Sequence, residues 1–190
     1  NYLNHAEDYG LKVEKADKDF TKVVERSRNV AEGMSKGVQF LMKKNKIDVL
    51  EGYGMVKPGK KVSVKDKDGK STDYEADHII IATGAHAREL PNLPIDGKKV
   101  IEYRKAMTLE KQPESMIIVG SGAIGCEFAS FYNDMGTDVT IVEFQPTIVP
   151  VEDEEVSKQF ERIYKKKGIK VMTNSSVESV DTSGKKVKAK

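Results

Sequence analysis

Between residues 18 and 45 the apolar residues recur at steps of three and four, which places them on one face of an α-helix. They are Phe20, Val23, Val24, Val30, Met34, Val38, Leu41 and Met42. Asp17 or Asp19 can cap the first turn, and the basic residues in 43–46 suit the negative end of the helix dipole. The pattern predicts a long amphipathic helix over 18–45 that packs its apolar stripe on a core.

After this helix the pattern changes to that of short strands. Val62 and Val64 alternate with polar residues, and the Asp-Gly turn at 66–69 is typical of a hairpin. A continuous apolar run at 78–82 predicts a buried strand that ends in a turn at Thr83 and Gly84. Residues 1–114 are therefore expected to hold the long helix followed by a β-meander within 47–82.

From residue 115 onward, strands and helices alternate. The predicted strands are 116–119, 139–142 and 169–172, and the predicted helices are 123–135 and 153–167. Such alternation predicts a parallel sheet with crossover helices. We therefore predict an α/β fold in which residues 115–190 form a Rossmann-like βαβαβ unit. Residues 185–190 alternate like a further strand whose partner would lie beyond the chain.

A glycine-rich turn stands between the first of these strands and its helix. Gly120, Gly122 and Gly125 form a Gly-x-Gly-x-x-Gly motif, and Glu143 follows the second strand, 18 positions after Gly125. In a dinucleotide site the first glycine makes the turn, the second lets a pyrophosphate approach the backbone, and the third lets the helix pack on the strand. The helix start then holds the phosphates.

Glu143 makes NAD the favoured ligand over NADP. A carboxylate at this position accepts hydrogen bonds from a ribose 2′-hydroxyl and repels a 2′-phosphate, and residues 144–150 contain no Lys or Arg. The motif leaves two alternatives open: FAD or another adenine nucleotide in the same site, or a glycine-rich turn with no ligand. Taken alone, the segment ending at Gly84 is a strand and a turn, and the glycines at 52 and 54 indicate a bend.

The composition narrows the function further. The net charge of +2, from 32 basic and 30 acidic residues, argues against a nucleic-acid partner. No apolar run approaches the roughly 18 residues of a membrane span. Cys126 is the only cysteine, which favours a reducing compartment such as the cytoplasm. It lies where a helix start lowers a thiol pKa, but a buried packing role is the simpler interpretation. The histidines lack metal-ligand spacing, so no metal and no catalytic residue is predicted.

The order of the motifs resembles that of the flavin disulfide oxidoreductases and, among them, of the NAD-linked enzymes that oxidise dihydrolipoamide. The matching segments are Glu51–Val56, Asp77–Gly84, Met116–Ala129, Val142–Phe144 and Asp153–Lys158. The resemblance implies FAD contacts from Gly54, Thr83, Gly84 and Ala85. It implies NAD contacts from Gly120, Ser121, Gly122, Ala123, Ile124, Gly125, Glu127, Glu143 and Val177.

The departures from that family are equally informative. The chain has only the second of the family's two glycine motifs and lacks its pair of redox cysteines and its C-terminal dimer domain. We expect an internal fragment in which both nucleotide domains are truncated: 1–114 from the FAD domain and 115–190 from the NAD domain. The FAD site would be incomplete and the fragment inactive. The resemblance implies that its parent is a homodimer within a 2-oxo acid dehydrogenase complex.

Two other functions stay open at this point. The chain could belong to a related NADH-dependent flavoenzyme, such as an NADH oxidase or a disulfide reductase. It could also be a non-catalytic module that binds NAD.

Overall fold

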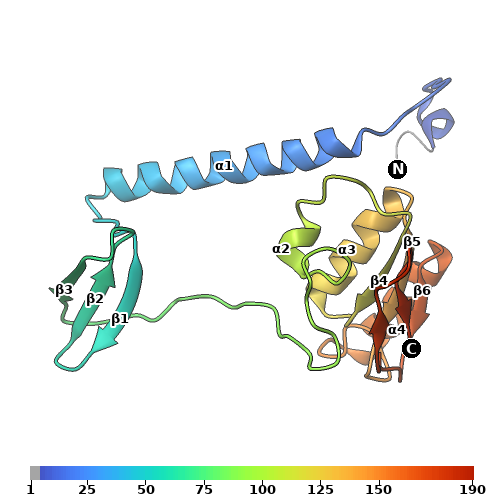
Figure 1. The fold of residues 1–190 in the computed structure, drawn as a ribbon. Helices are drawn as coiled ribbons and strands as arrows, with labels where there is room; N and C mark the ends of the chain where they lie inside the picture. Colours follow the sequence, from blue (N-terminus) through green and yellow to red (C-terminus); the bar gives the residue numbers. More distant parts are fainter. Residues whose placement is uncertain (1–4) are drawn as a thin grey trace. The chain divides into compact units, whose positions relative to one another are not determined.

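The computed structural model describes residues 5–190, so the first four residues of the predicted segment 1–114 lie outside the described part. Packing divides the chain into two compact units, one of residues 27–86 and the other of residues 5–26 together with 87–190. The first helix, α1 (Phe20–Lys44), has its first residues in the larger unit and the rest in the smaller one, and it matches the predicted helix over 18–45 (Figure 1). The predicted division at residue 114 concerns the domains of longer proteins and stays a prediction.

The larger unit is built on a three-stranded parallel sheet in the order β4 (Ser115–Val119), β5 (Asp138–Val142) and β6 (Lys170–Met172). Helices α3 (Ala123–Asp134) and α4 (Glu154–Lys166) connect the strands, and the short helix α2 (Tyr103–Ala106) precedes them (Figure 1). Ile118 pairs with Ile141, and Val142 pairs with Met172. The predicted α/β fold with its βαβαβ order is therefore confirmed.

The core of this unit lies on one face of the sheet. Alternate side chains of β5 point into it and meet residues from both helices, the start of α1 and the loops, namely Phe20, Cys126, Ala129, Tyr132, Val139, Ile141, Ile148, Tyr164 and Ile169. The two tyrosines satisfy their hydroxyls there, with Tyr132 donating to the Ala106 carbonyl at 2.6 Å and Tyr164 to the Cys126 carbonyl at 2.7 Å. Each large apolar side chain buried in this way stabilises the fold by about 1.5–3 kcal/mol.

The other face of the same sheet is less covered. Because side chains alternate along a strand, Ile117 and Val119 point away from the core, and both are exposed, as is Met172 on β6. Among the described residues, this leaves apolar side chains exposed on β4 and β6 on the side opposite to the helices, whereas Val142 of β5 is covered there.

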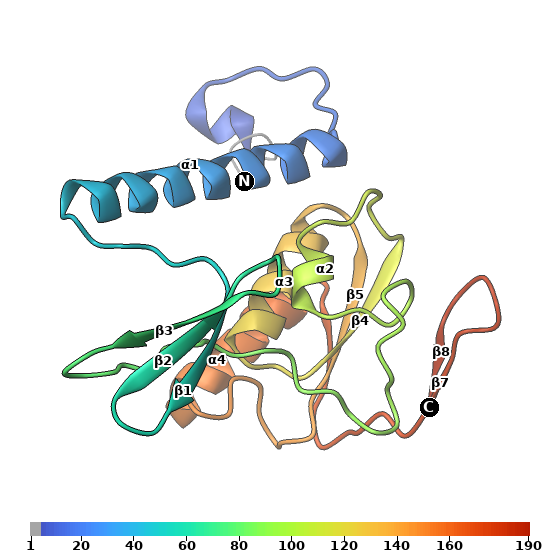
Figure 2. The same ribbon diagram turned by 60° about the vertical axis from the view of Figure 1, so that its left-hand side comes forward.

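The smaller unit contains an antiparallel meander of β1 (Tyr53–Lys57), β2 (Lys61–Lys65) and β3 (Ser71–Glu75), shown in Figure 2. The predicted turn between β2 and β3 is present: Asp66 Oδ1 accepts hydrogen bonds from the backbone N–H groups of Asp68 and Lys70. The apolar stripe of α1 does not pack on a core in this unit, and Met34 and Val38 are exposed. At the start of the helix, Phe20 and Val24 do pack on the core of the larger unit, so the helix was predicted correctly and its packing only in part.

The predicted strand at 78–82 is wrong. These residues have no regular structure, and the Ile80 side chain is 89% exposed. A strand exists only where a neighbouring strand takes up its backbone hydrogen bonds, and the meander ends at β3 instead. The apolar composition of the run was a local signal, whereas the pairing that makes a strand is not local.

The end of the chain forms a hairpin of β7 (Val180–Asp181) and β8 (Lys188–Ala189). The strand predicted within 185–190 is therefore present, but its partner precedes it in the chain. The connector before α2 lies beside this segment: Asn92 Nδ2 donates to the Val177 carbonyl at 2.5 Å, and Lys99 Nζ contacts the carbonyls of Thr182 and Gly184.

Candidate functional site

The glycine motif forms the turn from β4 into α3. Gly120 has φ +97°, a backbone conformation that other residues rarely adopt, and its N–H donates to the Val142 carbonyl at 2.9 Å. Gly125 lies against this turn: a Cβ added to it would come within 2.3 Å of the Gly120 carbonyl oxygen. Two of the predicted glycine functions, the turn and the close packing of helix on strand, therefore have a steric cause in this structure.

Gly122 faces open space instead. It is the N-cap residue of α3, and a Cβ placed on it would meet no atom within 4 Å. The helical hydrogen-bond ladder begins with the Cys126 N–H donating to the Gly122 carbonyl at 3.0 Å. Within residues 5–190, the N–H groups of Ala123 and Ile124 have no acceptor, as expected for a first helical turn. The start of α3 therefore offers free N–H donors, with open space beside them at Gly122.

Glu143 lies next to this turn because β5 ends beside β4. Its side chain is only 7% exposed. Its Oε2 accepts hydrogen bonds from the Ser121 N–H at 2.7 Å and the Ser121 hydroxyl at 2.6 Å, and its Oε1 accepts one from the Gln145 N–H at 2.8 Å. The structure thus brings the glycine turn and the predicted ribose-binding acid together, although 22 positions separate Ser121 from Glu143.

The charge of Glu143 is retained despite its burial. Burial acts to raise the pKa of this carboxyl, but the hydrogen bonds from Gln145 and Ser121 favour the ionised form and outweigh it, so the pKa lies below its ordinary value. A buried, ionised carboxylate beside a helix start accepts hydrogen bonds and repels anions. This is the chemistry that distinguishes a 2′-hydroxyl from a 2′-phosphate.

Cys126 lies on the inner side of the same turn. It is 2% exposed, and its Sγ contacts the Ser121 carbonyl at 3.3 Å. Burial, together with the negative charge of Glu143, raises the pKa of the thiol to about 11. The expectation of a packing residue is confirmed, and a thiol activated by the helix start is wrong for this position.

The other predicted NAD contacts belong to the same unit. Ile124 and Glu127 lie on the first turns of α3 with exposed side chains. Val177 is buried and packs with Leu93 and Val142 in a small second core. Its predicted contact with an adenine stays a prediction.

The four predicted FAD contacts lie in the smaller unit. Gly54 is within β1, where it pairs with Val64 of β2. Thr83, Gly84 and Ala85 follow the meander in irregular, exposed backbone, and Gly84 has φ +74°. Their predicted contacts with FAD stay a prediction.

Sequence reasoning missed two partners of the site. The Gln145 N–H and the Ser121 hydroxyl both hold the Glu143 carboxylate. The Gln145 N–H carried no clear signal, because a side-chain bond to the N–H two residues later is typical of Asp, Asn, Ser and Thr and not of Glu. The Ser121 hydroxyl carried none, because its direction depends on the packed turn.

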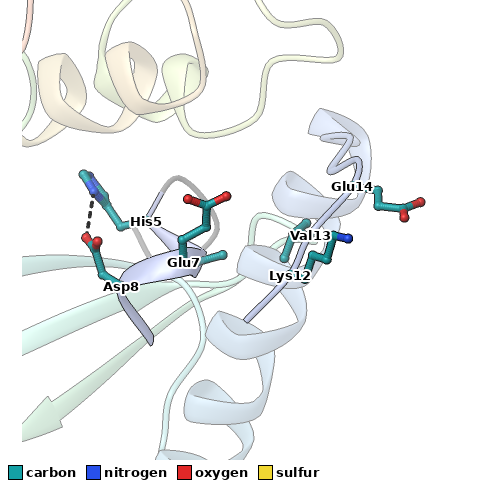
Figure 3. A pocket seen from close by; sticks show the side chains of 7 residues that line it. His5, Glu7, Asp8, Lys12, Val13 and Glu14 are labelled. Atoms are coloured by element: carbon teal, nitrogen blue, oxygen red, sulfur yellow. Dashed lines mark ion pairs between the residues drawn. The ribbon is translucent and has the colours of Figure 1, made fainter. Parts of the chain in front are cut away.

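A hollow near the start of the described chain is lined by residues of 5–14, and Figure 3 shows His5 and Asp8 paired across 3.5 Å. Most of its lining side chains are polar and exposed, apart from the buried Ala6 and the apolar Val13. Within residues 5–190, no cluster of His, Cys, Asp or Glu has the arrangement of a metal site. No helix in this part of the chain is both long and apolar enough to cross a membrane.

Comparison with known proteins places these features in one family. Residues 5–190 match the family described as pyridine nucleotide-disulphide oxidoreductase. The chain is 43% identical to a dihydrolipoyl dehydrogenase of Zymomonas mobilis over 94% of its own length, and 44% identical to one of Rhizobium etli over 95%. It spans 38% and 41% of those two proteins.

Solved structures give the same result for the fold. LpdA from Mycobacterium tuberculosis matches 98% of this chain and 41% of its own with a TM-score of 0.89, at 26% sequence identity. The parallel sheet, the glycine turn and the acid at the end of β5 therefore occur in a fold shared with a relative of known structure. On the match over residues 5–190, this chain belongs to the pyridine nucleotide-disulphide oxidoreductase family.

Proposed function

We propose that the larger unit binds NAD at the start of α3. The observation that carries the proposal is the meeting of the glycine turn with the buried Glu143 carboxylate. The pyrophosphate would lie beside Gly122, where no side chain intervenes, and accept hydrogen bonds from the N–H groups of Ala123 and Ile124. Gly120 and Gly125 would shape this turn rather than contact the ligand through side chains.

The residues present fit a nicotinamide dinucleotide. The adenosine ribose would donate to Glu143, and Val177 would contact the adenine. Ile124 and Glu127 would lie toward the nicotinamide. In its oxidised form this ring accepts a hydride. Ser121 belongs to this site through its bonds to Glu143.

NAD is proposed over NADP because of the charge at Glu143. Its carboxylate is held ionised by three hydrogen bonds, and the loop that follows it has no basic side chain to neutralise a phosphate. FAD in this site, which the motif alone left open, is disfavoured because the family of this chain is described by its pyridine nucleotide.

The test of the NAD site is calorimetric titration of NAD and NADP into the wild-type chain and a Glu143→Ala variant. We expect NAD to bind more tightly than NADP, and the variant to lose both affinity for NAD and the difference between the two. Equal binding of NAD and NADP by the wild type would contradict the proposal.

For the longer protein we propose dihydrolipoyl dehydrogenase activity, supported by the names of relatives that are 43% and 44% identical. In such an enzyme Gly54, Thr83, Gly84 and Ala85 would contribute to an FAD site completed by other segments. We further propose that it is a homodimer within a 2-oxo acid dehydrogenase complex. A cytoplasmic location is supported by the single, reduced cysteine.

The present chain alone is expected to be inactive, because it holds one cysteine and therefore no redox disulfide. Dihydrolipoamide oxidation with added FAD and NAD should stay at background for this chain. Turnover above background would contradict the fragment interpretation. In the full-length protein, oxidation of NADH by oxygen without lipoamide would favour the related NADH oxidases instead.

A further inference from the structure

Ser121 has a side-chain environment that its place in the glycine motif did not predict. It stands between Gly120 and Gly122, where a ligand would be expected, yet it is 0% exposed. Both of its donors are committed to the same atom, because its N–H and its hydroxyl donate to Glu143 Oε2 at 2.7 and 2.6 Å. Ser121 therefore has no donor to offer a phosphate.

The acceptors of Glu143 can be accounted for individually. An ionised carboxylate has about four acceptor positions, two on each oxygen. Ser121 occupies both positions on Oε2, and the Gln145 N–H occupies one on Oε1. The Phe144 N–H also interacts with the carboxylate. Oε1, which has no contact with Ser121, is therefore the oxygen that a ribose hydroxyl would reach.

Ser121 is itself held in place by the turn. Its carbonyl accepts a hydrogen bond from the Val149 N–H at 3.0 Å and a weak one from Cys126 Sγ at 3.3 Å. The backbone N–H and the carbonyl of Ser121 are thus both held by hydrogen bonds. The hydroxyl of this fixed residue in turn holds the Glu143 carboxylate in place.

We propose that Ser121 is a positioning residue that determines the nucleotide specificity of this site by fixing the Glu143 carboxylate. This rests on the proposed NAD site. With Oε2 held by Ser121, Oε1 is directed at the 2′ position of the ribose. The Glu143 carboxylate therefore cannot rotate away from a 2′-phosphate, and it is not readily protonated. A carboxylate without this anchor would still carry charge, but it would discriminate less between a 2′-hydroxyl and a 2′-phosphate.

The first test is a Ser121→Ala variant of the full chain, titrated calorimetrically with NAD and with NADP. We expect affinity for NAD to fall about tenfold, the effect of losing one hydrogen bond to a charged group. Affinity for NADP should fall less or rise, so that the ratio of the two affinities shrinks. An equal loss for both nucleotides would indicate a merely structural role and would overturn the proposal.

A matched control is Thr137→Val, which also removes a buried hydroxyl from this unit. Thr137 is 2% exposed and donates to the Pro113 carbonyl at 2.8 Å, away from the glycine turn. We expect this variant to be destabilised without a change in the ratio of the NAD and NADP affinities. A ratio that shrinks as much as in Ser121→Ala would overturn the proposal.

A double-mutant cycle with Glu143→Ala tests the route of the effect. If Ser121 acts through Glu143, then adding Ser121→Ala to Glu143→Ala causes no further loss of NAD affinity. Additive losses would show that Ser121 acts on the ligand by another route, and would overturn the proposal.

A third measurement does not depend on nucleotide binding. The Glu143 carboxyl carbon is followed by NMR during a pH titration of the wild type and of both single-hydroxyl variants. We expect a pKa below the ordinary value in the wild type and in Thr137→Val, and a higher pKa in Ser121→Ala. If the Ser121→Ala chain folds, an unchanged Glu143 pKa in it would overturn the proposal. If it does not fold, a Glu143 pKa at the ordinary value in the wild type would overturn the proposal.

The nucleotide titrations and the NMR measurement of the Glu143 pKa together separate this inference from the proposed function. If neither nucleotide binds to the wild type, the NAD site fails and the specificity role fails with it, while a raised Glu143 pKa in Ser121→Ala would still support the positioning contact. If NAD binds selectively but the ratio and the pKa are unaffected by Ser121→Ala, the NAD site stands and the role of Ser121 is wrong.

Discussion

A single methyl group added at Gly125 should destabilise the larger unit, whereas the same group added at Gly122 should not. The Cβ of an alanine at residue 125 would lie 2.3 Å from the Gly120 carbonyl oxygen and 3.4 Å from a methyl of Ile118. The carbonyl belongs to the backbone of a turn fixed by its hydrogen bond partners, so it has no side-chain rotation by which to move away. Relief requires a shift of about 1 Å between helix and strand, given that ordinary contacts begin at 3.4 Å.

The size of the effect follows from two opposing contributions. Forcing extra atoms into packed structure costs about 1–3 kcal/mol, and a backbone contact belongs at the upper end. Alanine is a better helix former than glycine by about 1 kcal/mol. The net loss is about 2 kcal/mol, which for a unit of this size lowers the thermal midpoint by about 8 °C.

Gly122→Ala is the matched control. There is open space around this glycine, and its φ of −66° is accessible to alanine. Alanine is a poorer N-cap, but it also reduces the freedom of the unfolded chain, and these contributions of under about 1 kcal/mol each offset one another. We expect a midpoint close to that of the wild type and weaker NAD binding, because the methyl occupies the space proposed for the pyrophosphate.

Thermal unfolding followed by circular dichroism, with NAD titration of each folded variant, decides between these expectations. A Gly125→Ala chain as stable as the wild type would refute the steric argument. A Gly122→Ala chain that loses as much stability as Gly125→Ala would refute the contrast between the two glycines.

Three further predictions follow from the packing and the ionisable groups. Since the pKa of Glu143 is lowered in the folded chain, its carboxylate should stabilise the fold above the ordinary value of 4.5, and this contribution should be lost as the pH falls through the lower folded value. Thermal midpoints of wild type and Glu143→Gln should therefore differ at pH 7, and the difference should shrink as the pH falls below 4.5; a constant gap would contradict this. Cys126, with its pKa raised to about 11, should react with a thiol reagent at pH 8 only as fast as the folded chain opens. In denaturant it should react immediately. Rapid stoichiometric reaction of the native chain would count against its burial. The exposed apolar face at Ile117 and Val119 should cause association that rises with concentration; light scattering that finds only 21.1 kDa monomers at every concentration would exclude it.

The elements of the larger unit were predictable from sequence because each carries its own local signals. Helix α4 shows this well: Asp153 caps its start, with the carboxylate accepting from the Glu155 N–H at 2.8 Å, and basic residues close its end. Strand β5 was found from its apolar run, and the glycine motif located the turn before α3. In these segments local preference and tertiary packing agree.

Prediction failed where the deciding contact lies far along the chain. The run at 78–82 has the composition of a buried strand, but among the described residues no strand pairs with it. Likewise, the motif indicated that Ser121 and Glu143 serve one site, yet it gave no sign that the serine hydroxyl is turned inward to the carboxylate. That direction follows from the packing of α3 on β4, which a linear pattern does not contain.

The most direct test of the account is an NMR titration of the isotope-labelled chain with NAD, in which each backbone amide reports on its own surroundings. We predict that the largest shifts occur at the amides of Gly122, Ala123 and Ile124 and at those following Glu143, with little change in the meander of β1 to β3. Shifts centred on the meander, or no shift at the start of α3 under saturating NAD, would contradict the proposed site.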